Sequence, residues 1–275
     1  MVTTKATLAS FMAGGPLPDA PAAAVRWPRK FDVLGVEVSA TTYDELVPLF
    51  IAAAQRGQPA LATFLPVHGI VTGARDLTYR YRINAFDVVG PDGQPVRWAL
   101  NKLHNACLAD RVYGPELMMR LCAAAANHDV PIYLYGSTPE VLSALSVKLV
   151  QRCPGLQIAG AESPPFRRLS DVETTAVIDR INASGAGLVF IGLGCPRQDV
   201  FAHDNRHAIR PVQLCVGAAF DFHAGTKKMA PAWMQKRGLE WLFRLTQEPG
   251  RLWRRYLVTN TTFVFLMARR LVTGR

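Results

Sequence analysis

The sequence contains few of the patterns that mark a disulfide framework or a metal centre. Its five cysteines are dispersed and form no C-x-x-C pair. Its six histidines form no H-E-x-x-H motif, and His203 and His207, four residues apart, fit a solvated helix face better than a zinc site. An odd, scattered set of thiols is typical of a reducing compartment. We therefore expect a cytoplasmic protein with free cysteines and no metal site.

Long apolar runs are also missing. No run reaches the ~20 residues that a membrane-spanning helix requires. The longest candidate near the carboxy terminus, residues 262–268, stops at Arg269 and Arg270. Residues 1–29 are rich in Gly, Pro and Ala, and their only apolar run is too short for a secretory signal. We expect this segment to be a flexible leader, and we expect any membrane contact to be peripheral.

Acidic residues are scarce in the carboxy-terminal segment. Residues 227–275 hold eleven of the 31 Lys and Arg residues and only two acids, Glu240 and Glu248, which gives a charge of +9. The preceding 226 residues carry only +1. The same segment is rich in Trp, Leu, Phe and Met. A basic, amphipathic tail on a nearly neutral body predicts docking on an anionic partner, which can be a membrane face, a diphosphate or a nucleic acid.

The rest of the chain has the composition of a globular α/β protein. It has 275 residues, of which 49% are hydrophobic and 19% charged. Apolar runs predict strands over residues 31–38, 60–67, 86–89, 131–135, 187–193 and 212–216. Periodic patterns predict helices over residues 43–55, 115–127, 139–152 and 172–184. This alternation predicts a Rossmann-like parallel sheet with helices on both faces over residues 30–226. Two further helices, 231–246 and 251–272, are expected to form an appendage over 227–275.

Three of the predicted strands run into glycine-bearing turns. Parallel sheets bind ligands at the carboxyl ends of their strands, so these turns predict the site. The first turn is GPDG, with Asp92 at its centre. A carboxylate at this position is suited to act as a general base that accepts a proton from a substrate hydroxyl group. The alternative is a plain turn, because Pro-Asp-Gly is a common turn sequence.

The other two turns carry candidate phosphate contacts. Gly192 and Gly194 permit close approach of a phosphate to the backbone, and Gly136 and Ser137 precede a helix whose free N–H groups suit a nucleotide phosphate. A capped helix start is the simpler account of the latter. The third glycine of a dinucleotide motif is missing, so a nicotinamide cofactor is not expected. Gln198 is placed to hydrogen-bond a sugar or a base, or to cap the following helix.

The tail carries candidate anion ligands. Arg244 and Arg251 are seven residues apart and are expected to lie near one face of a helix, with Arg254 and Arg255 one turn further on. Guanidinium groups suit bidentate phosphate binding, and the neighbouring aromatic residues suit a lipid headgroup boundary. The alternative is a solvated basic face over a packed apolar stripe.

Several strings together resemble the WecG/TagA/CpsF family, glycosyltransferase family 26. They are FDVLGVEV (31–38), GPDG (90–93), PIYLYGSTPE (131–140), FIGLGCPRQD (190–199), VGAAFDFHAGT (216–226) and APAWMQKRGLEWLFRLTQEPGRLWRRYL (230–257). The resemblance extends from about Phe31 to Val272. It implies an inverting transferase that moves a sugar from a UDP-sugar to a polyprenyl-diphosphate-linked saccharide. Such enzymes work at the cytoplasmic membrane face in the synthesis of teichoic acid linkage units, common antigen or exopolysaccharides.

The resemblance also implies roles for single residues. Asp92 corresponds to the proposed general base, while Thr63 and Gln198 correspond to substrate-binding positions. Three arginines proposed to hold the lipid diphosphate correspond to Arg244, Arg251 and Arg254. No D-x-D metal clamp is present, so a metal-independent reaction with no cofactor is expected.

The sequence departs from the family pattern at two positions. Leu65 replaces a usual Asn, and Met229 replaces a usual Arg. These losses of polar groups leave open which sugars are used. They also leave open a non-catalytic scaffold of the same fold. The basic charge separately permits a nucleic-acid binder, although no DNA- or RNA-binding motif is present. A homo-oligomer is also compatible with the sequence.

Overall fold

A computed structural model describes residues 23–274 and contains one large sheet. Its strands are β3 (Leu61–Leu65), β4 (Val88–Pro91), β5 (Ile132–Gly136), β6 (Ile158–Glu162), β7 (Leu188–Gly192) and β8 (Val212–Cys215). They are all parallel, in the order β4-β3-β8-β7-β5-β6. The four central strands are buried almost throughout, as expected for a parallel sheet that is covered on both faces.

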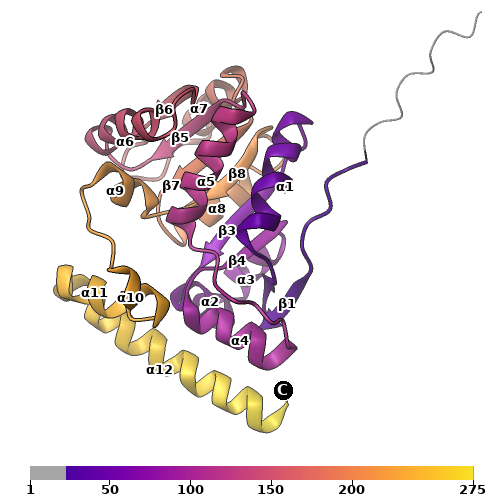
Figure 1. Cartoon of the computed structure of the whole chain (residues 1–275), viewed down its shortest axis with the longest axis vertical. Coiled ribbons are helices and arrows are strands. Elements are labelled where there is room, and N and C mark those ends of the chain that lie inside the picture. Colours follow the sequence, from indigo (N-terminus) through magenta and orange to yellow (C-terminus); the bar gives the residue numbers. More distant parts are fainter. Residues whose placement is uncertain (1–22, 275) are drawn as a thin grey trace, which may run out of the picture.

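Helices cover both faces of the sheet (Figure 1). One face packs against α1 (Tyr43–Gln55), α5 (Gly114–Asn127), α6 (Pro139–Arg152) and α9 (Ala219–Ala224). The other packs against α2 (Val67–Arg75), α3 (Leu77–Asn84), α4 (Gln94–His104), α7 (Asp171–Ala183) and α8 (Arg197–Asp204). Each face of the sheet packs into its own hydrophobic core, and successive strand residues point to opposite faces. In β5, for example, Leu134 lies in the first core, with α1, α5, α6 and α9, and Tyr135 lies in the second core on the other face. The predicted Rossmann-like architecture is therefore confirmed.

Local chemistry sets where these helices begin. The Thr138 hydroxyl accepts a hydrogen bond from the Val141 N–H at 3.3 Å and caps α6. Ser170 and Glu173 form a reciprocal capping box at the start of α7. The predicted helices 43–55 and 139–152 have the observed bounds, and the other predicted helices of the α/β domain lie within one residue of theirs.

Two predicted elements are each split in the structure. The strand expected over 31–38 is an antiparallel hairpin of β1 (Lys30–Val33) and β2 (Val36–Ser39). Leu34 and Gly35 have φ values of 58° and 89°, which makes a tight two-residue turn. The helix expected over 231–246 is divided into α10 (Ala232–Lys236) and α11 (Glu240–Gln247), because Gly238 between them has a φ of 71°. Arg244 and Arg251 lie on different helices, not on one face of a single helix, because α11 ends at Gln247 and α12 begins at Pro249.

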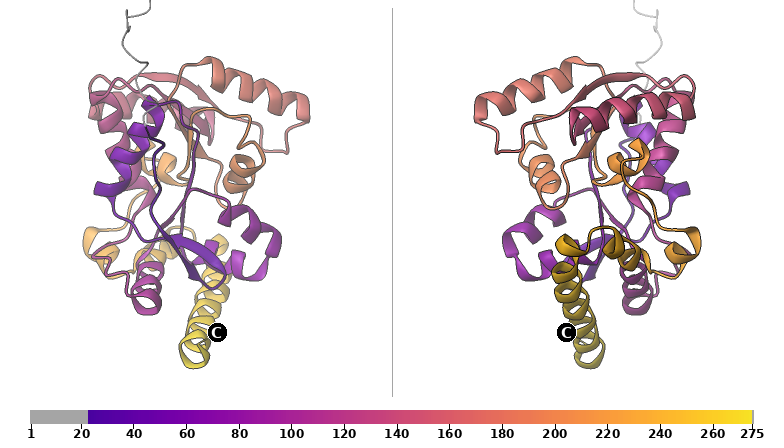
Figure 2. Two further views of the ribbon diagram at one scale, coloured as in Figure 1. Left: turned by 90° about the vertical axis from the view of Figure 1, so that its right-hand side faces the viewer. Right: turned by 90° about the vertical axis from the view of Figure 1, so that its left-hand side faces the viewer.

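The appendage ends in one long helix, α12 (Pro249–Thr273), at the end of the molecule remote from α6 and α7 (Figures 1 and 2). Its inner face packs against the body next to α2 through Leu252, Thr259 and Phe263, which are buried. Arg270, near its end, forms an ion pair with Asp32 of the β1–β2 hairpin at 3.0 Å. The helix is therefore attached to the α/β domain along most of its length.

The amino-terminal residues are described only in part. Most of the leader predicted over residues 1–29 lies outside the described residues. Within residues 23–29, the Val25 N–H donates to Gln58 Oε1 at 2.8 Å, and the Trp27 ring lies 5.3 Å from that of Phe50 on α1. These residues therefore run along α1.

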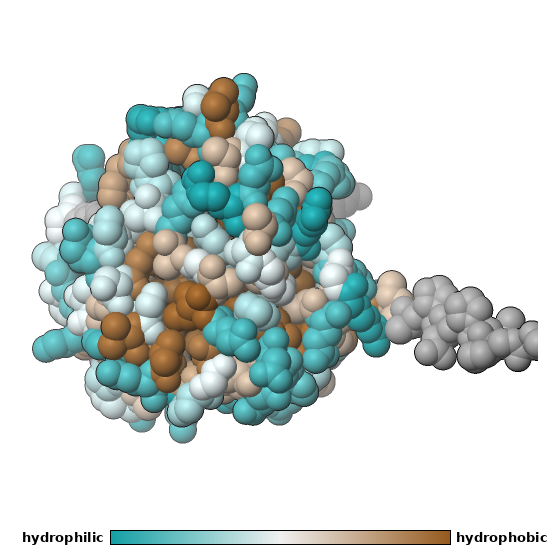
Figure 3. Space-filling model, turned by 90° about the horizontal axis from the view of Figure 1, so that it is seen from above, coloured by the Kyte–Doolittle hydropathy of each residue, from teal (hydrophilic) through white to brown (hydrophobic). Residues whose placement is uncertain are grey.

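Apolar side chains are exposed at both ends of the molecule. At the end remote from α12, hydrophilic residues occupy most of the rim and an apolar area lies across the middle (Figure 3). Exposed apolar residues are numerous on α12 and include Trp253, Leu257 and Phe265. Nevertheless, none of the helices within residues 23–274 has the length and apolar character needed to cross a bilayer.

The close approach of β5 and β7 gives a first prediction. A Cβ atom on Gly136 would lie 2.6 Å from the backbone carbon of Gly192, in a backbone conformation with a φ of 128°. We expect Gly136→Ala to lower the free energy of unfolding by about 2 kcal/mol or more, because the backbone of β7 cannot yield. Gly250→Ala is the control, since nothing lies within 4 Å of its Cβ position. Urea unfolding measures both, and equal stability of the two variants would contradict the prediction.

Candidate active site

The three glycine-bearing turns lie along the carboxyl edge of the sheet, because β4, β5 and β7 are parallel. The chain leaving β5 leads to β6 on one side, whereas the chain leaving β7 leads to β8 on the other. Ligands of parallel sheets bind in the crevice at such a divergence. Gly136 and Gly192, which pair across it, mark the candidate nucleotide position.

Asp92 lies at the same edge, immediately after β4. Its N–H donates to the Leu65 carbonyl oxygen at 3.2 Å, which fixes the turn against β3. Two strands, β3 and β8, separate β4 from β7. At about 4.8 Å per strand, the carboxylate and the nucleotide position are about 14 Å apart along the edge. A sugar nucleotide has the length to span such a distance.

The surroundings of Asp92 weaken it as an acid. Its side chain is only 19% exposed, and burial raises its pKa to about 7. Arg111 and Arg244 lower this pKa, whereas Glu240 raises it. The Gly114 N–H at the start of α5 also stabilises the charged form. A carboxyl group whose pKa lies near 7 is suited to accept a proton at physiological pH.

Arg111 is the central cation of this region. It is 5% exposed, and its Nη1 lies 3.9 Å from Asp92 Oδ1. The same Nη1 donates to Glu240 Oε2 of α11. Its guanidinium carbon also lies 4.3 Å from the centre of the Tyr113 ring. A buried guanidinium needs compensating charge, and the carboxylates of Asp92 and Glu240 near Nη1 supply it to Arg111.

The appendage therefore contributes directly to the surroundings of Asp92. Glu240, one of the two acids of the tail, reaches Arg111 in the α/β domain. Arg244, one turn further along α11, packs over the Phe222 ring at 5.7 Å and is close enough to lower the Asp92 pKa. Of the predicted site residues, the structure thus brings Asp92 and Arg244 together.

The turn after β7 is held by Gln198. Its Oε1 accepts from the Gly194 N–H at 3.1 Å, and its side chain is 3% exposed. In this structure Gln198 therefore holds the turn against the first turn of α8, and its predicted contact with a sugar or a base stays a prediction. On the neighbouring strand, Gly136 and Ser137 have φ values of 128° and 62°, and the Ser137 carbonyl accepts from Ser163 Oγ at 2.7 Å.

Thr63 lies beneath the edge and is completely buried. Its hydroxyl donates to Asp199 Oδ1 at 2.7 Å, and the Tyr79 hydroxyl donates to Asp199 Oδ2 at 2.8 Å. Burial raises the pKa of Asp199, which the bonds from Thr63 and Tyr79 oppose. This network attaches β3 and α3 to the start of α8, so Thr63 here positions α8. Its predicted contact with substrate stays a prediction.

Close contacts connect the two ends of the edge. A Cβ on Gly114 would lie 3.9 Å from Asp92 Oδ2 and 3.6 Å from the Val216 carbonyl oxygen. A Cβ on Gly217, the next residue, would lie 3.3 Å from Gln198 Oε1. The base candidate, the end of β8 and the Gln198 turn are therefore linked by close contacts.

The remaining predicted residues have other surroundings. Arg254 is exposed and lies 5.6 Å over the Trp253 ring, whereas nothing is described of the Arg251 side chain. His203 is 6% exposed and is hydrogen-bonded to Asp204. The expectation that His203 and His207 form a solvated pair is therefore wrong for His203. Within the described part of the chain, no cluster of three or more His, Cys, Asp or Glu residues could hold a metal ion.

The two departures from the family pattern also differ in their surroundings. Leu65 is 1% exposed and packs in the second core beneath α2, so an apolar residue fits that position well. Met229 is 43% exposed in the connection between α9 and α10. Neither residue disturbs the arrangement around Asp92.

Sequence reasoning missed several of the side chains that build this region. Arg111 and Tyr113 lie in an irregular segment before α5 that carries no motif. Asp199 closes the string FIGLGCPRQD, and an acid one residue beyond Gln198 was an available signal. The sequence identifies Glu240 as one of only two acids in the cationic tail but predicts no partner for it. An acid that stands alone among cations was an available signal of a specific ion pair.

The buried ion pair between the tail and the body gives a second prediction. We expect Glu240→Gln to lower the free energy of unfolding by about 2 kcal/mol, because Arg111 is left buried with a single distant carboxylate. Glu116→Gln is the matched control, since its pair with Arg120 is half-exposed on α5 and is worth less than about 1 kcal/mol. Thermal and urea unfolding compare the two. Equal losses would show that the pair with Arg111 has no special role.

Comparison with known families agrees with this geometry. The sequence profile described as the glycosyl transferase WecG/TagA/CpsF family matches residues 31–275. The match covers the whole α/β domain and the appendage, including the turn of Asp92 and the helix of Glu240. Because the match extends over nearly the entire chain, the protein belongs to the WecG/TagA/CpsF family of glycosyltransferases.

Proposed function

We propose that this protein is an inverting glycosyltransferase that moves a sugar from a UDP-sugar to a polyprenyl-diphosphate-linked saccharide in cell-surface polysaccharide synthesis. The observation that carries the proposal is Asp92, a carboxyl group with a pKa of about 7 at the carboxyl edge of the sheet. It lies at the same edge of the sheet as the turns at Gly136 and Gly192. A base and a nucleotide position at one edge suit attack by an acceptor hydroxyl on an activated sugar.

In the proposed reaction, Asp92 accepts the proton of the acceptor hydroxyl, whose oxygen attacks the anomeric carbon from the face opposite UDP. The bond to the diphosphate breaks, and UDP leaves with the electron pair. Arg111 and Arg244, which face Asp92, would supply positive potential close to the reacting groups. The helix N-termini beyond Gly136 and Gly194 would supply more at the nucleotide. We propose that this charge serves in place of a metal, so activity should persist in EDTA.

The appendage is proposed to bring the enzyme to its lipid-linked acceptor at the inner face of the membrane. Trp253, Leu257, Val264 and Leu271 recur at helical spacing on α12, and each is at least 49% exposed. Arg254 lies beside this stripe, with its guanidinium carbon 5.6 Å from the centre of the Trp253 ring. An exposed apolar stripe with flanking cations is typical of a helix that lies in a lipid headgroup region.

The base assignment predicts a defined pH dependence. For the wild type, kcat/KM should rise as the pH passes through about 7, because only the charged form of Asp92 accepts a proton. Asp92→Asn should lower turnover by about 100-fold or more and abolish this dependence, with UDP-sugar affinity nearly unchanged. Release of UDP with a polyprenyl-linked acceptor measures turnover, and calorimetry measures donor binding.

Two controls accompany this experiment. Asp44→Asn removes a carboxylate that is 95% exposed and should leave turnover unchanged. Because its folded-state pKa is raised, Asp92 lowers the free energy of unfolding progressively as the pH rises from its ordinary pKa of 3.8 to about 7, and the full loss is present above that pH. Asp92→Asn should therefore be at least as stable as the wild type at pH 8. Full turnover in Asp92→Asn would refute the base assignment, and no UDP release by the wild type would favour a scaffold.

Membrane docking is tested on the apolar stripe. We expect the double variant Trp253→Ser and Leu257→Ser to bind vesicles containing phosphatidylglycerol about tenfold or more weakly, because two exposed apolar side chains no longer enter the headgroup region. Phe166→Ser with Val172→Ser is the matched control, since both residues are at least 76% exposed but lie outside the tail. Flotation measures binding. Undiminished flotation of the tail variant would exclude this stripe as the docking face.

A further inference from the structure

The short helix α9 contacts four different parts of the molecule through four consecutive side chains, those of residues 220–223. It follows β8 and lies in the string VGAAFDFHAGT. Five of its six residues are buried. At its end, the Ala224 carbonyl oxygen accepts from Lys148 Nζ at 2.6 Å, which fastens α9 to α6. The position of α9 is therefore fixed by its surroundings.

The first two of these side chains reach the nucleotide position and the beginning of the tail. A Cβ atom on Gly192 would lie 2.6 Å from a ring carbon of Phe220, so this ring packs directly on the end of β7. Asp221 Oδ2 lies 3.3 Å from Lys227 Nζ, which also lies 3.3 Å from Glu248 Oε1. Helix α9 is thus attached both to the edge of the sheet and to the appendage.

The third side chain, Phe222, supports Arg244 of α11. The guanidinium carbon lies 5.7 Å from the centre of the ring, which is 8% exposed. A cation is attracted to an aromatic face, and the buried ring restricts where the cation can lie. Arg244 in turn lowers the pKa of Asp92. Phe222 therefore holds a charge that acts on the base candidate.

The fourth side chain, His223, supports the start of α5. Its Nε2 lies 2.8 Å from the Pro115 carbonyl oxygen. Because a carbonyl oxygen only accepts, Nε2 carries the proton and donates. Pro115 follows Gly114, whose N–H stabilises the charged form of Asp92 and whose Cβ position lies 3.9 Å from Asp92 Oδ2. The bond from His223 therefore fixes the part of α5 that faces the base candidate.

Packing alone does not account for an imidazole at this position. His223 is 3% exposed, and its Nδ1 is buried with no hydrogen-bond partner among residues 23–274. Burial lowers its pKa, and Arg152 of α6 adds to this effect, whereas the bond to Pro115 and the charge of Glu116 oppose it. The ring is therefore neutral near pH 7. A leucine would fill the space without an unpaired acceptor, so the bond from Nε2 is what distinguishes histidine here.

We propose that α9 positions Asp92 and Arg244 relative to each other, and that His223 and Phe222 are the positioning residues. His223 acts through the start of α5, and Phe222 acts through Arg244. Because the two are neighbours in one helix, they cannot move independently, and the carboxylate and the guanidinium are held by one rigid element. The proposal rests on the proposed function only in taking Asp92 as the base.

The groups that face Asp92 determine the direction of the expected effect. Burial raises its pKa, and three groups lower it: Arg111, Arg244 and the Gly114 N–H. The other ionisable groups near it are Glu240, Tyr43 and Tyr113. The charge of Glu240 raises the pKa of Asp92, and the two phenols stay neutral because burial raises their own pKa values. A weaker hold on Arg244 or on the start of α5 would therefore raise the pKa of Asp92.

The proposal is tested by titration of the Asp92 carboxyl group in the full-length protein. Its carbon-13 chemical shift is followed against pH and assigned by its loss in Asp92→Asn. We expect His223→Leu and Phe222→Leu each to raise the midpoint by about 0.5 or more on the pH scale. His223→Gln should restore the wild-type midpoint, because its amide nitrogen can donate to Pro115 in place of Nε2. With donor and acceptor present, both leucine variants should lower kcat about tenfold and leave KM for the donor nearly unchanged.

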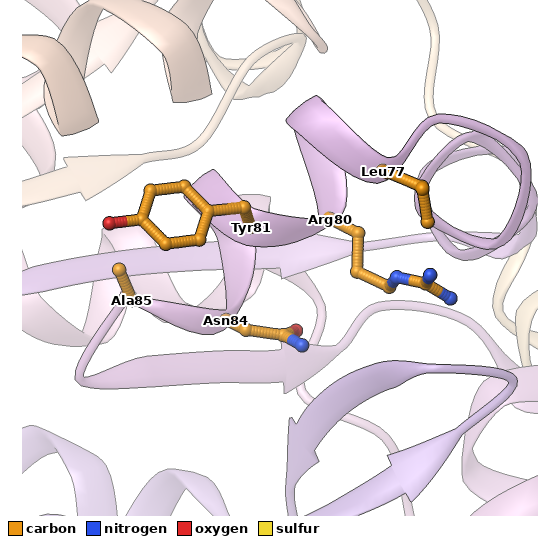
Figure 4. Close-up of a pocket in the computed structure, with 5 residues that line it drawn as sticks. All are labelled: Leu77, Arg80, Tyr81, Asn84 and Ala85. Carbon is orange, nitrogen blue, oxygen red and sulfur yellow. The ribbon is translucent and has the colours of Figure 1, made fainter.

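Two controls lie on the opposite face of the sheet from α9. Tyr81 of α3 lines a hollow of about 430 Å³ together with Leu77, Arg80, Asn84 and Ala85 (Figure 4). Its ring is 70% exposed, and Tyr81→Leu also replaces an aromatic residue by leucine. Ile181 of α7 is completely buried in the second core, so Ile181→Ala lowers stability there. Neither change should move the midpoint of Asp92, and thermal unfolding of every variant is measured alongside.

The outcomes separate this proposal from the proposed reaction. A midpoint that is unchanged or lower in either leucine variant overturns the role of α9. An equal rise in a control overturns it too, because the effect would then follow any loss of stability. A midpoint of His223→Gln that matches His223→Leu overturns the assignment to the bond with Pro115. The titration requires no turnover, so it decides the role of α9 even if the wild type releases no UDP and the proposed reaction fails.

Discussion

The buried group formed by Arg111 with Asp92 and Glu240 is the interaction on which the rest of the site depends. It joins the end of β4, the segment before α5 and the first turn of α11 around one guanidinium. Burial, helped by the nearby charge of Glu240, keeps the pKa of Asp92 raised, while Arg111 leaves its carboxylate paired. The same contact fixes the appendage to the α/β domain, so the electrostatics of the site and the placement of the tail are set together.

Backbone groups and charged side chains occupy different parts of the carboxyl edge of the sheet. At β5 and β7 the backbone itself approaches closely, with Gly136 against Gly192, and side chains such as Gln198 hold the turns. At β4 the important groups are charged side chains that come from distant parts of the chain. Beneath the edge, Asp199 connects Thr63 and Tyr79 and so attaches α8 and α3 to β3. The turns are thus supported from below by a buried polar network.

The sequence predicted the parallel sheet and the turn of Asp92, because apolar periodicity and glycine-bearing strand ends are local signals. It did not predict the hairpin at Leu34, the break at Gly238, or α2, α3, α4 and β6, where the patterns are short or polar. It also missed Arg111, because a partnership across 129 residues of chain leaves no local pattern. The resemblance to a family implies roles for the tail arginines. The surroundings of each arginine could be known only from the packing of α11 and α12.

The connection between α9 and α10 has a consequence for the whole molecule. It is an irregular segment with exposed residues such as Lys228 and Met229, and it is the only covalent link between the body and Glu240. After a single proteolytic cut there, only non-covalent contacts would hold the tail to the body. Loss of the smaller fragment would deprive Arg111 of its partner from α11 and the second core of Phe263.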